Sequence, residues 1–411
     1  MTATLCLLAY GAVMVYSASS PAGVIESGGY GTGEFLMYLF AAAIGLFLMR
    51  VMERRGLQLL NERVVRLLLL GSFALLIAVM MPGVGRSYGT GAQRWLGAGP
   101  IQFQPSELMK ITLVLYVARY LADNPRRMQR TFKEAVAPIA IVVVPACVLI
   151  AGEPDLGTTL VVFFTILSVL IVGGMPMRYL VMIIAAAMVA GVMFVLAEPY
   201  QRARLLSFLH PFASEKNGGY QAAQGQIALG SGGVFGDGLG NSLQKLLWLP
   251  EAQTDFILAV IGEELGALGI LALVALYGMI AYAGLRTARR AATRHTKLLA
   301  SGLTSLILCQ AILNIFVVLG IAPLTGVPLP FISYAPTNLI VMLGSVGLLM
   351  GIARPAAKEL KLVDRRPQRA ATAAAREANG EAYGYATDRD RGRRDGRTRG
   401  AGAGRRGRAA G

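Results

Sequence analysis

Residues 256–285 read FILAVIGEELGALGILALVALYGMIAYAGL, thirty residues with only two charged side chains. About 20 apolar residues in a helix cross the hydrocarbon core of a bilayer. This stretch therefore predicts a membrane-spanning helix. Its two charged residues, Glu263 and Glu264, are expected to pair with polar groups inside a bundle of helices, because an unpaired charge in lipid is costly.

Nine further apolar runs recur along the chain, and with the first they predict ten membrane helices. The nine are residues 3–17, 35–52, 67–81, 108–122, 136–151, 158–174, 179–197, 298–319 and 339–353. The composition agrees, because 55% of the 411 residues are hydrophobic, 15% are charged and the mean hydropathy is +0.56. We therefore expect an all-α polytopic membrane protein.

Basic residues are distributed unevenly between the connections. They gather after the second, fourth and eighth runs, and Arg178 follows the sixth. The connections 18–34, 152–158 and 320–337 contain no Lys or Arg. Because short loops rich in Lys and Arg stay in the cytoplasm, the basic connections and both termini are expected there.

Two outward connections, 82–107 and 198–255, are long enough to indicate function. We divide the chain into a ten-helix membrane domain of residues 1–353, which includes the large outward loop at about 198–255, and a disordered basic cytoplasmic tail of residues 354–411. The tail has too few large apolar residues to fold. Tail and cytoplasmic loops account for much of the net charge of +16, so this charge is weak evidence for nucleic-acid binding.

Cysteine and histidine usage excludes several kinds of site. Cys6, Cys147 and Cys309 each lie inside an apolar run, and His210 and His295 are far apart in the sequence. This pattern argues against disulfide frameworks, zinc sites and histidine-based triads. No dedicated metal cage is predicted.

Polar side chains gather where outward connections meet apolar runs. Arg94-Trp95 couples a cation to an indole, which suits an anionic head group beside a sugar or lipid; an interfacial tryptophan with an arginine anchor explains it equally well. Glu107 and Lys110 share one helix face, and they form either a structural pair or a contact to a phosphate.

Two carboxylates stand just before apolar runs. Asp155 follows Pro154 in a very short turn, and capping of the next helix at Thr158 would explain it alone. Asp255 precedes the 256–285 run at the predicted membrane–water boundary. Burial there would raise the pKa of Asp255 and make it a better base at neutral pH, while a simple helix cap is the alternative.

Glycines are frequent in the second half of the large outward loop. Gly232-Gly233 and the run from Gly236 to Gly240 permit either tight turns or the close approach of the backbone to another group. The pattern leaves both interpretations open.

At these residues the chain resembles the SEDS family, the multi-spanning peptidoglycan polymerases typified by FtsW and RodA. The matching segments follow the family order over roughly residues 10–353, and they are Tyr16-Ser17-Ala18-Ser19, Arg94-Trp95, Gln104-Pro105-Ser106-Glu107, Glu153-Pro154-Asp155-Leu156-Gly157, Gly238-Leu239-Gly240-Asn241-Ser242, Thr254-Asp255-Phe256, Gly262-Glu263-Glu264-Leu265-Gly266 and Pro328-Leu329-Pro330-Phe331-Ile332-Ser333-Tyr334. The residues around Lys245 and Glu251 are more similar to FtsW than to RodA.

The resemblance implies a SEDS-type bundle of ten spans with a large extracytoplasmic loop between helices 7 and 8. It implies a peptidoglycan glycosyltransferase that polymerises lipid II, an undecaprenyl-pyrophosphate-linked disaccharide-peptide, at the outer face of the bacterial cytoplasmic membrane during cell division. Asp255 matches the essential aspartate of the family and is the expected base. The expected substrate-binding residues are Arg94, Trp95, Glu107, Lys110, Asp155, Lys245 and Ser333.

The resemblance also implies partners: a class B penicillin-binding protein as transpeptidase, other divisome proteins, membrane lipid and the lipid II substrate, but no nucleic acid. The residues predict no bound cofactor, although a divalent cation could bridge the pyrophosphate oxygens of the substrate.

Three other functions stay open. A flippase that transports lipid II would need polar residues from one membrane face to the other, whereas the ionisable residues here crowd the outward end. A RodA-like polymerase of cell elongation is the second. An inactive scaffold is the third, because Ala335-Pro336 stands where the family usually carries two glycines. Separately, Gln253 stands where histidine is common in the family, which removes a possible proton partner of Asp255.

Overall fold

The structure is a computed structural model, and it describes residues 1–27, 31–86, 93–98, 101–209, 219–246 and 248–354. Residues Met1–Pro355 form one compact unit. The predicted tail lies outside the described residues, apart from its first residue, and His210 does as well.

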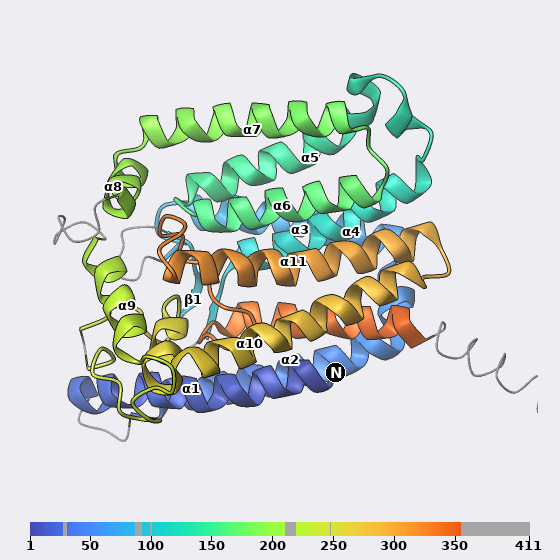
Figure 1. Cartoon of the computed structure of the whole chain (residues 1–411). Helices are drawn as coiled ribbons and strands as arrows, with labels where there is room; N and C mark the ends of the chain where they lie inside the picture. Colours follow the sequence, from blue (N-terminus) through green and yellow to red (C-terminus); the bar gives the residue numbers. More distant parts are fainter. Residues whose placement is uncertain (28–30, 87–92, 99–100, 210–218, 247, 355–411) are drawn as a thin grey trace, which may run out of the picture. The chain divides into compact units, whose positions relative to one another are not determined.

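Helices dominate the described part of the chain, as predicted (Figure 1). They are α1 (Thr2–Ser27), α2 (Gly33–Leu59), α3 (Glu62–Met80), α4 (Pro105–Asp123), α5 (Phe132–Gly152), α6 (Leu156–Val172), α7 (Met177–Ala197), α8 (Pro199–Leu209), α9 (Gly219–Ser231), α10 (Ile257–Arg289), α11 (Arg294–Val318), the short 3-10 helix η1 (Arg127–Gln129) and a last helix, Pro336–Arg354. Each of the ten predicted apolar runs falls on a helix. The first two helices extend well beyond the predicted ends at residues 17 and 52, since α1 continues to Ser27 and α2 to Leu59.

Eight of the described helices are long and apolar enough to cross a membrane. The two remaining predicted runs fall on α4 and α6. The 19 residues of α4 include four charged ones, and α6 has only 17 residues. The chain is therefore a multi-pass membrane protein, and the count of ten spans stays a prediction.

The helix α11 lies at the centre of the packing. It contacts α10, α6 and α4, while α3 packs on α4 and α1 packs on α10. In contrast, α7 buries only two residues, Tyr179 and Leu180, and it lies at the edge of the helices in Figure 1. An apolar helix with so little buried surface is stable only if lipid or another protein covers it.

The predicted outward loop at about 198–255 contains two helices that were not predicted from the sequence, α8 and α9. In Figure 1 both lie at the same end of the long helices as the strand β1 (Leu96–Ala98). This strand pairs with β2 (Ile101–Phe103) in an antiparallel hairpin. The Thr337 hydroxyl donates to the Gln102 carbonyl at 3.1 Å, which ties the hairpin to the beginning of the last helix.

The long helix α10 is broken at Gly266, whose φ of 65° and ψ of −165° are far from helical values. The break removes the two helical hydrogen bonds that would join Ala267 to Glu263 and Leu268 to Glu264. The loop 233–238 replaces them. The Asp237 and Gly238 N–H groups donate to the Glu263 and Glu264 carbonyls at 2.9 and 3.0 Å, and the Gly233 and Val234 carbonyls accept from Ala267 and Leu268 at 3.0 and 3.3 Å.

This exchange explains the glycine-rich run. A side chain at Gly236 would lie 2.3 Å from the Glu264 carbonyl oxygen, so only glycine lets the loop approach the broken helix this closely. The second interpretation of the glycine pattern, close approach of the backbone, holds here, and the group approached is the protein's own helix.

Candidate active site

Asp255 lies two residues before the first helical residue of α10. Phe256 occupies the N-cap position, and no side-chain cap bond forms there, so Asp255 does not serve as a simple helix cap. The Asn314 side chain of α11 donates to the backbone carbonyls of Asp255 and Val327, each at 2.8 Å. Among the described residues, the half-buried Asp255 carboxylate has no hydrogen bond or ion pair of its own. Its backbone is fixed while its side chain stays available.

Arg94 faces this carboxylate from the segment before β1. Its Nε donates to the Glu153 carbonyl at 2.8 Å, and its Nη2 donates to the Pro154 carbonyl. A methyl group added at Gly326 would lie 3.2 Å from Asp255 Oδ2 and 3.9 Å from Arg94 Nη1, so both charged groups border the same glycine. The structure thus brings together Asp255 and Arg94, two residues that the sequence analysis singled out separately.

A second arginine, Arg204 of α8, completes this site. It donates to the Leu324 carbonyl at 3.3 Å and lies over the Tyr200 ring at 4.8 Å. Its charge acts on Asp255, and burial lowers the pKa of Arg204. Arg204 was not among the residues predicted from the sequence. The available signal was an arginine in a connection predicted to face outward, where Lys and Arg are normally scarce.

The surroundings of Asp255 favour its protonated form more than water does. Burial raises the pKa of Asp255 to about 7, and the negative charge of Glu251 adds to the rise. The guanidinium groups of Arg204 and Arg94 oppose it, and Asp155 contributes a further small rise. A carboxylate in this range exchanges protons near neutral pH, as a general base must.

The turn between α5 and α6 supplies two further carboxyl groups. Asp155 accepts from the Thr158 N–H at 3.0 Å and from Gln104 Nε2 at 3.3 Å. Asp155 therefore caps α6, as one of the predicted alternatives stated. Glu153 is 2% exposed, and neither of its carboxyl oxygens has a hydrogen-bond partner among the described residues. Burial, with a smaller contribution from Asp155, raises the pKa of Glu153 to about 8.

Lys110 belongs to a buried network, which we call the Lys110 network and which consists of Glu107, Lys110, Gln310 and Asn338. The Lys110 ammonium donates to Glu107 at 2.9 Å and to Gln310 at 2.8 Å. Asn338 donates to the other Glu107 oxygen at 2.7 Å. This is the structural pair that the sequence analysis gave as one alternative, and every charged atom in it has a partner.

Lys245 is enclosed in the same way. Its ammonium donates to Glu264 at 2.7 Å and to the Ser17 hydroxyl at 3.0 Å, and that hydroxyl donates to Glu264. The neighbouring Glu263 accepts from the Ser242 hydroxyl and, at 2.9 Å, from the Leu243 N–H. Both glutamates of the quoted stretch therefore pair inside the bundle, as expected.

The remaining predicted residues hold the backbone near the site. The Trp95 carbonyl accepts from the Arg86 N–H at 2.9 Å, and its indole is half-buried. The Ser333 hydroxyl accepts from the Leu329 N–H at 2.8 Å and closes a turn. Pro336 is the first residue of the last helix, a position that suits proline because its missing N–H needs no partner there.

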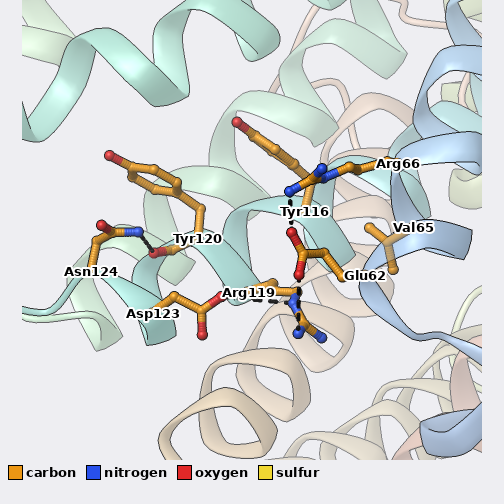
Figure 2. Close-up of a pocket in the computed structure, with 8 residues that line it drawn as sticks. All are labelled: Glu62, Val65, Arg66, Tyr116, Arg119, Tyr120, Asp123 and Asn124. Carbon is orange, nitrogen blue, oxygen red and sulfur yellow. Dashed lines mark hydrogen bonds and ion pairs between the residues drawn. The ribbon is translucent and has the colours of Figure 1, made fainter.

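A separate pocket of about 300 Å³ lies at the other end of α4, between that helix and the beginning of α3 (Figure 2). It is lined by Glu62, Val65, Arg66, Tyr116, Arg119, Tyr120, Asp123 and Asn124. Arg66 pairs with Glu62, and Arg119 lies 3.7 Å from Asp123 and 3.9 Å from Glu62. These charges neutralise one another, so the pocket offers no free base.

Within the described ranges, no group of three or more His, Cys, Asp or Glu residues could hold a metal ion. The three carboxyl groups near Arg94 therefore do not form a cation cage by themselves.

Comparison with known proteins identifies the family of this chain. The sequence profile of the FtsW, RodA and SpoVE family, described as "Cell cycle protein", matches residues 1–358. The chain is 36% identical over 353 residues to "Probable peptidoglycan glycosyltransferase FtsW" of Pseudomonas fluorescens (strain SBW25), and the matched residues make up 85% of each chain. It is 34% identical to "Stage V sporulation protein E" of Bacillus subtilis (strain 168), over 85% of this chain and 95% of that one.

Solved structures show the same fold. A chain of the structure titled "Structural coordination of polymerization and crosslinking by a peptidoglycan synthase complex" superposes with a TM-score of 0.68 at 28% identity, over 86% of this chain and 96% of that one. Rod shape determining protein RodA of Thermus thermophilus gives a TM-score of 0.61 at 28% identity, over 86% and 95%. The chain therefore belongs to the FtsW, RodA and SpoVE family, which is the SEDS family that its motifs resemble.

Proposed function

We propose that this protein is a peptidoglycan glycosyltransferase of the FtsW type, which polymerises lipid II into glycan strands at the outer face of the bacterial cytoplasmic membrane during cell division. One observation supports the proposal: the Asp255 carboxylate has no hydrogen-bond partner among the described residues, it borders the same glycine as Arg94, and the charges of Arg94 and Arg204 both act on it. Such a site holds a base and an anion-binding surface together.

The reaction assigns these groups distinct roles. Asp255 takes the proton of the acceptor sugar's 4-hydroxyl as that oxygen attacks the anomeric carbon of the donor. The bond from that carbon to the lipid pyrophosphate breaks, and the two arginines stabilise the charge that develops on the leaving oxygen. A single attack inverts the anomeric carbon and requires no covalent enzyme intermediate.

The other predicted contacts take supporting parts in this proposal. Asp155 orients the turn that binds Arg94, and Trp95 offers an apolar face beside the sugar. Lys110 and Lys245 each have a carboxylate partner, so a direct contact to substrate would require their networks to open, and that role stays a prediction together with those of Glu107 and Ser333.

The partner and the orientation also belong to the proposal. A chain with the same fold is part of a peptidoglycan synthase complex, which supports a penicillin-binding protein of class B as partner of this chain, with other divisome proteins around it. The basic connections support cytoplasmic termini, and the Asp255 site then lies at the outer membrane surface. The division into a membrane domain of residues 1–353 and a tail of residues 354–411 stays a prediction.

The test uses the purified full chain and fluorescent lipid II, with and without the partner transpeptidase. Asp255→Ala is expected to abolish glycan polymer, because no other described carboxylate occupies its place. Asp237→Asn changes an exposed carboxylate on the same loop and serves as the matched control, with polymer retained. Undiminished polymer from Asp255→Ala would overturn the assignment.

A further inference from the structure

The Glu153 carboxyl group differs from the other buried glutamates in the described part of the chain. Glu107, Glu263 and Glu264 all accept hydrogen bonds, whereas both carboxyl oxygens of Glu153 lack a partner among the described residues, although the residue is only 2% exposed. An ionised carboxylate without partners is very costly in such surroundings. The position therefore requires either a proton on Glu153 or a change in its neighbours.

The nearest cation does not compensate for this. Arg94 donates through Nε and Nη2 to the backbone carbonyls of Glu153 and Pro154, not to the Glu153 carboxyl. Its Nη1 instead lies near Gly326, beside Asp255. The guanidinium group is thus anchored by the backbone carbonyls of Glu153 and Pro154 and forms no hydrogen bond with the Glu153 carboxyl.

The charged groups around Glu153 come from several elements. Asp155 of the same turn repels a negative charge there, and Arg94 from the segment before β1 attracts one. Arg204 of α8 acts on Asp155 and Asp255, and the Asp255 carboxylate belongs to the same charged cluster. Burial dominates this balance, so the pKa of Glu153 is raised to about 8 and its neutral form prevails at pH 7.

We propose that Glu153 is a positioning residue that works as a neutral carboxylic acid, and that its neutrality keeps the Arg94 guanidinium available to Asp255 and to the leaving pyrophosphate. The inference rests on the proposed function. If Glu153 ionised, it would become the nearest strong acceptor for Arg94, because charge-assisted hydrogen bonds are about twice as strong as neutral ones. Asp255 would then lose one of its two cations.

The first test measures polymerisation of fluorescent lipid II by the full chain from pH 6 to pH 10. We expect the wild-type rate to fall above about pH 8, where Glu153 ionises. Glu153→Gln places a neutral amide of nearly the same shape at this position, so it should retain at least half of the wild-type rate at pH 7. Its alkaline decline should begin at least one pH unit above that of the wild type. An alkaline decline at the same pH in both proteins would overturn the inference.

Glu198→Gln is the matched control, because Glu198 is an exposed glutamate at the outward end of α7. It should decline at the same pH as the wild type. Glu153→Ala also lacks an ionisable group at this position, so whatever rate it retains at pH 7 should persist to the same higher pH as in Glu153→Gln. A decline of Glu153→Ala at the wild-type pH would contradict the inference.

A second readout does not depend on catalysis. The raised pKa means that the folded protein keeps a proton on Glu153 at pH values where the unfolded chain has already released it. Glu153 therefore lowers the stability of the fold progressively as pH rises from its ordinary pKa toward 8. The midpoint of thermal unfolding of Glu153→Gln should therefore exceed that of the wild type by more at pH 9 than at pH 6. An equal difference at both pH values would overturn the inference. If the difference in unfolding midpoint does grow with pH but no variant makes polymer, the result would count against the proposed function alone.

Discussion

Two regions on the same face of α11 carry similar residues and differ in how those residues are paired. Gln310 of α11 accepts from Lys110 in the Lys110 network, and Asn314, one turn further along, holds the backbone carbonyl of Asp255. Lys110 is bonded to Glu107, so the network is closed. The charges of two arginines act on the Asp255 carboxylate, but within the described part of the chain neither forms a hydrogen bond or ion pair with it, so its site is open.

The difference teaches how a membrane protein separates structural charges from reactive ones. A buried charge whose partners are all present holds neighbouring helices in place and has no remaining capacity for a ligand. A carboxylate left without partners destabilises the fold, and such groups with shifted pKa values gather at functional sites. Three variants test this distinction.

The largest effect is expected from opening the closed region. Lys110→Met leaves the Glu107 carboxylate buried without its cation, and loss of one partner of a buried ion pair costs about 3–5 kcal/mol. The unfolding free energy or the thermal unfolding midpoint in detergent measures this loss. Lys133→Met, which removes an exposed lysine of α5, should change stability little. A Lys110→Met protein of wild-type stability would contradict the structural assignment of the network.

A smaller effect is expected from weakening the open region. Arg204→Gln removes a cation that lowers the pKa of Asp255, so that pKa should rise and less base should be ionised at pH 7. It also removes a charged contact to the pyrophosphate, worth about 1.5–3 kcal/mol, and together these predict a polymerisation rate reduced about 10- to 100-fold. The control Arg202→Gln, an exposed arginine on the same helix, should keep its rate. Equal rates in the two variants would remove Arg204 from the site.

The smallest effect is expected at Gly326, which has a φ of +69° and borders both Asp255 and Arg94. Gly326→Ala should slow polymerisation about fivefold, because displacing a reacting group by a fraction of an ångström reduces the rate. Gly174→Ala is the control, since Gly174 has a φ of +84° but no atom within 4 Å of an added methyl group. Both variants carry the backbone strain. If both slow the reaction equally, the strain and not the contact with Asp255 is responsible.

Much of the fold could be predicted from the sequence, because apolar length decides where a membrane helix forms. The long apolar runs identified α10 and α11 within a few residues. The break of α10 at Gly266 could not be predicted, because a single glycine in an apolar run is tolerated in a straight helix. The break depends on hydrogen bonds from the loop 233–238, which only the folded chain supplies.

The site could be predicted in part. Asp255, Arg94 and Asp155 were singled out by their position at the outward ends of apolar runs, and all three contribute to one electrostatic cluster. The Glu107–Lys110 pair was one of two alternatives predicted from the sequence. The choice between them, and the enclosure of Lys245, could not be predicted, because Gln310 and Ser17 come from segments far away in the sequence. Arg204 was missed because α8 is too short and too polar to stand out inside a long loop.

The central claim is that Asp255 is a base whose pKa lies near 7, because burial raises this pKa and two arginines limit the rise. The most direct measurement is the rate of glycan polymerisation between pH 5 and pH 8. With a pKa of about 7, the ionised base declines as pH falls, so the rate at pH 5 should be about 100-fold below its maximum. The midpoint of the decline should lie near pH 7 and should move to higher pH in Arg204→Gln. A rate that stays constant down to pH 5, or a midpoint that does not respond to Arg204→Gln, would contradict the claim.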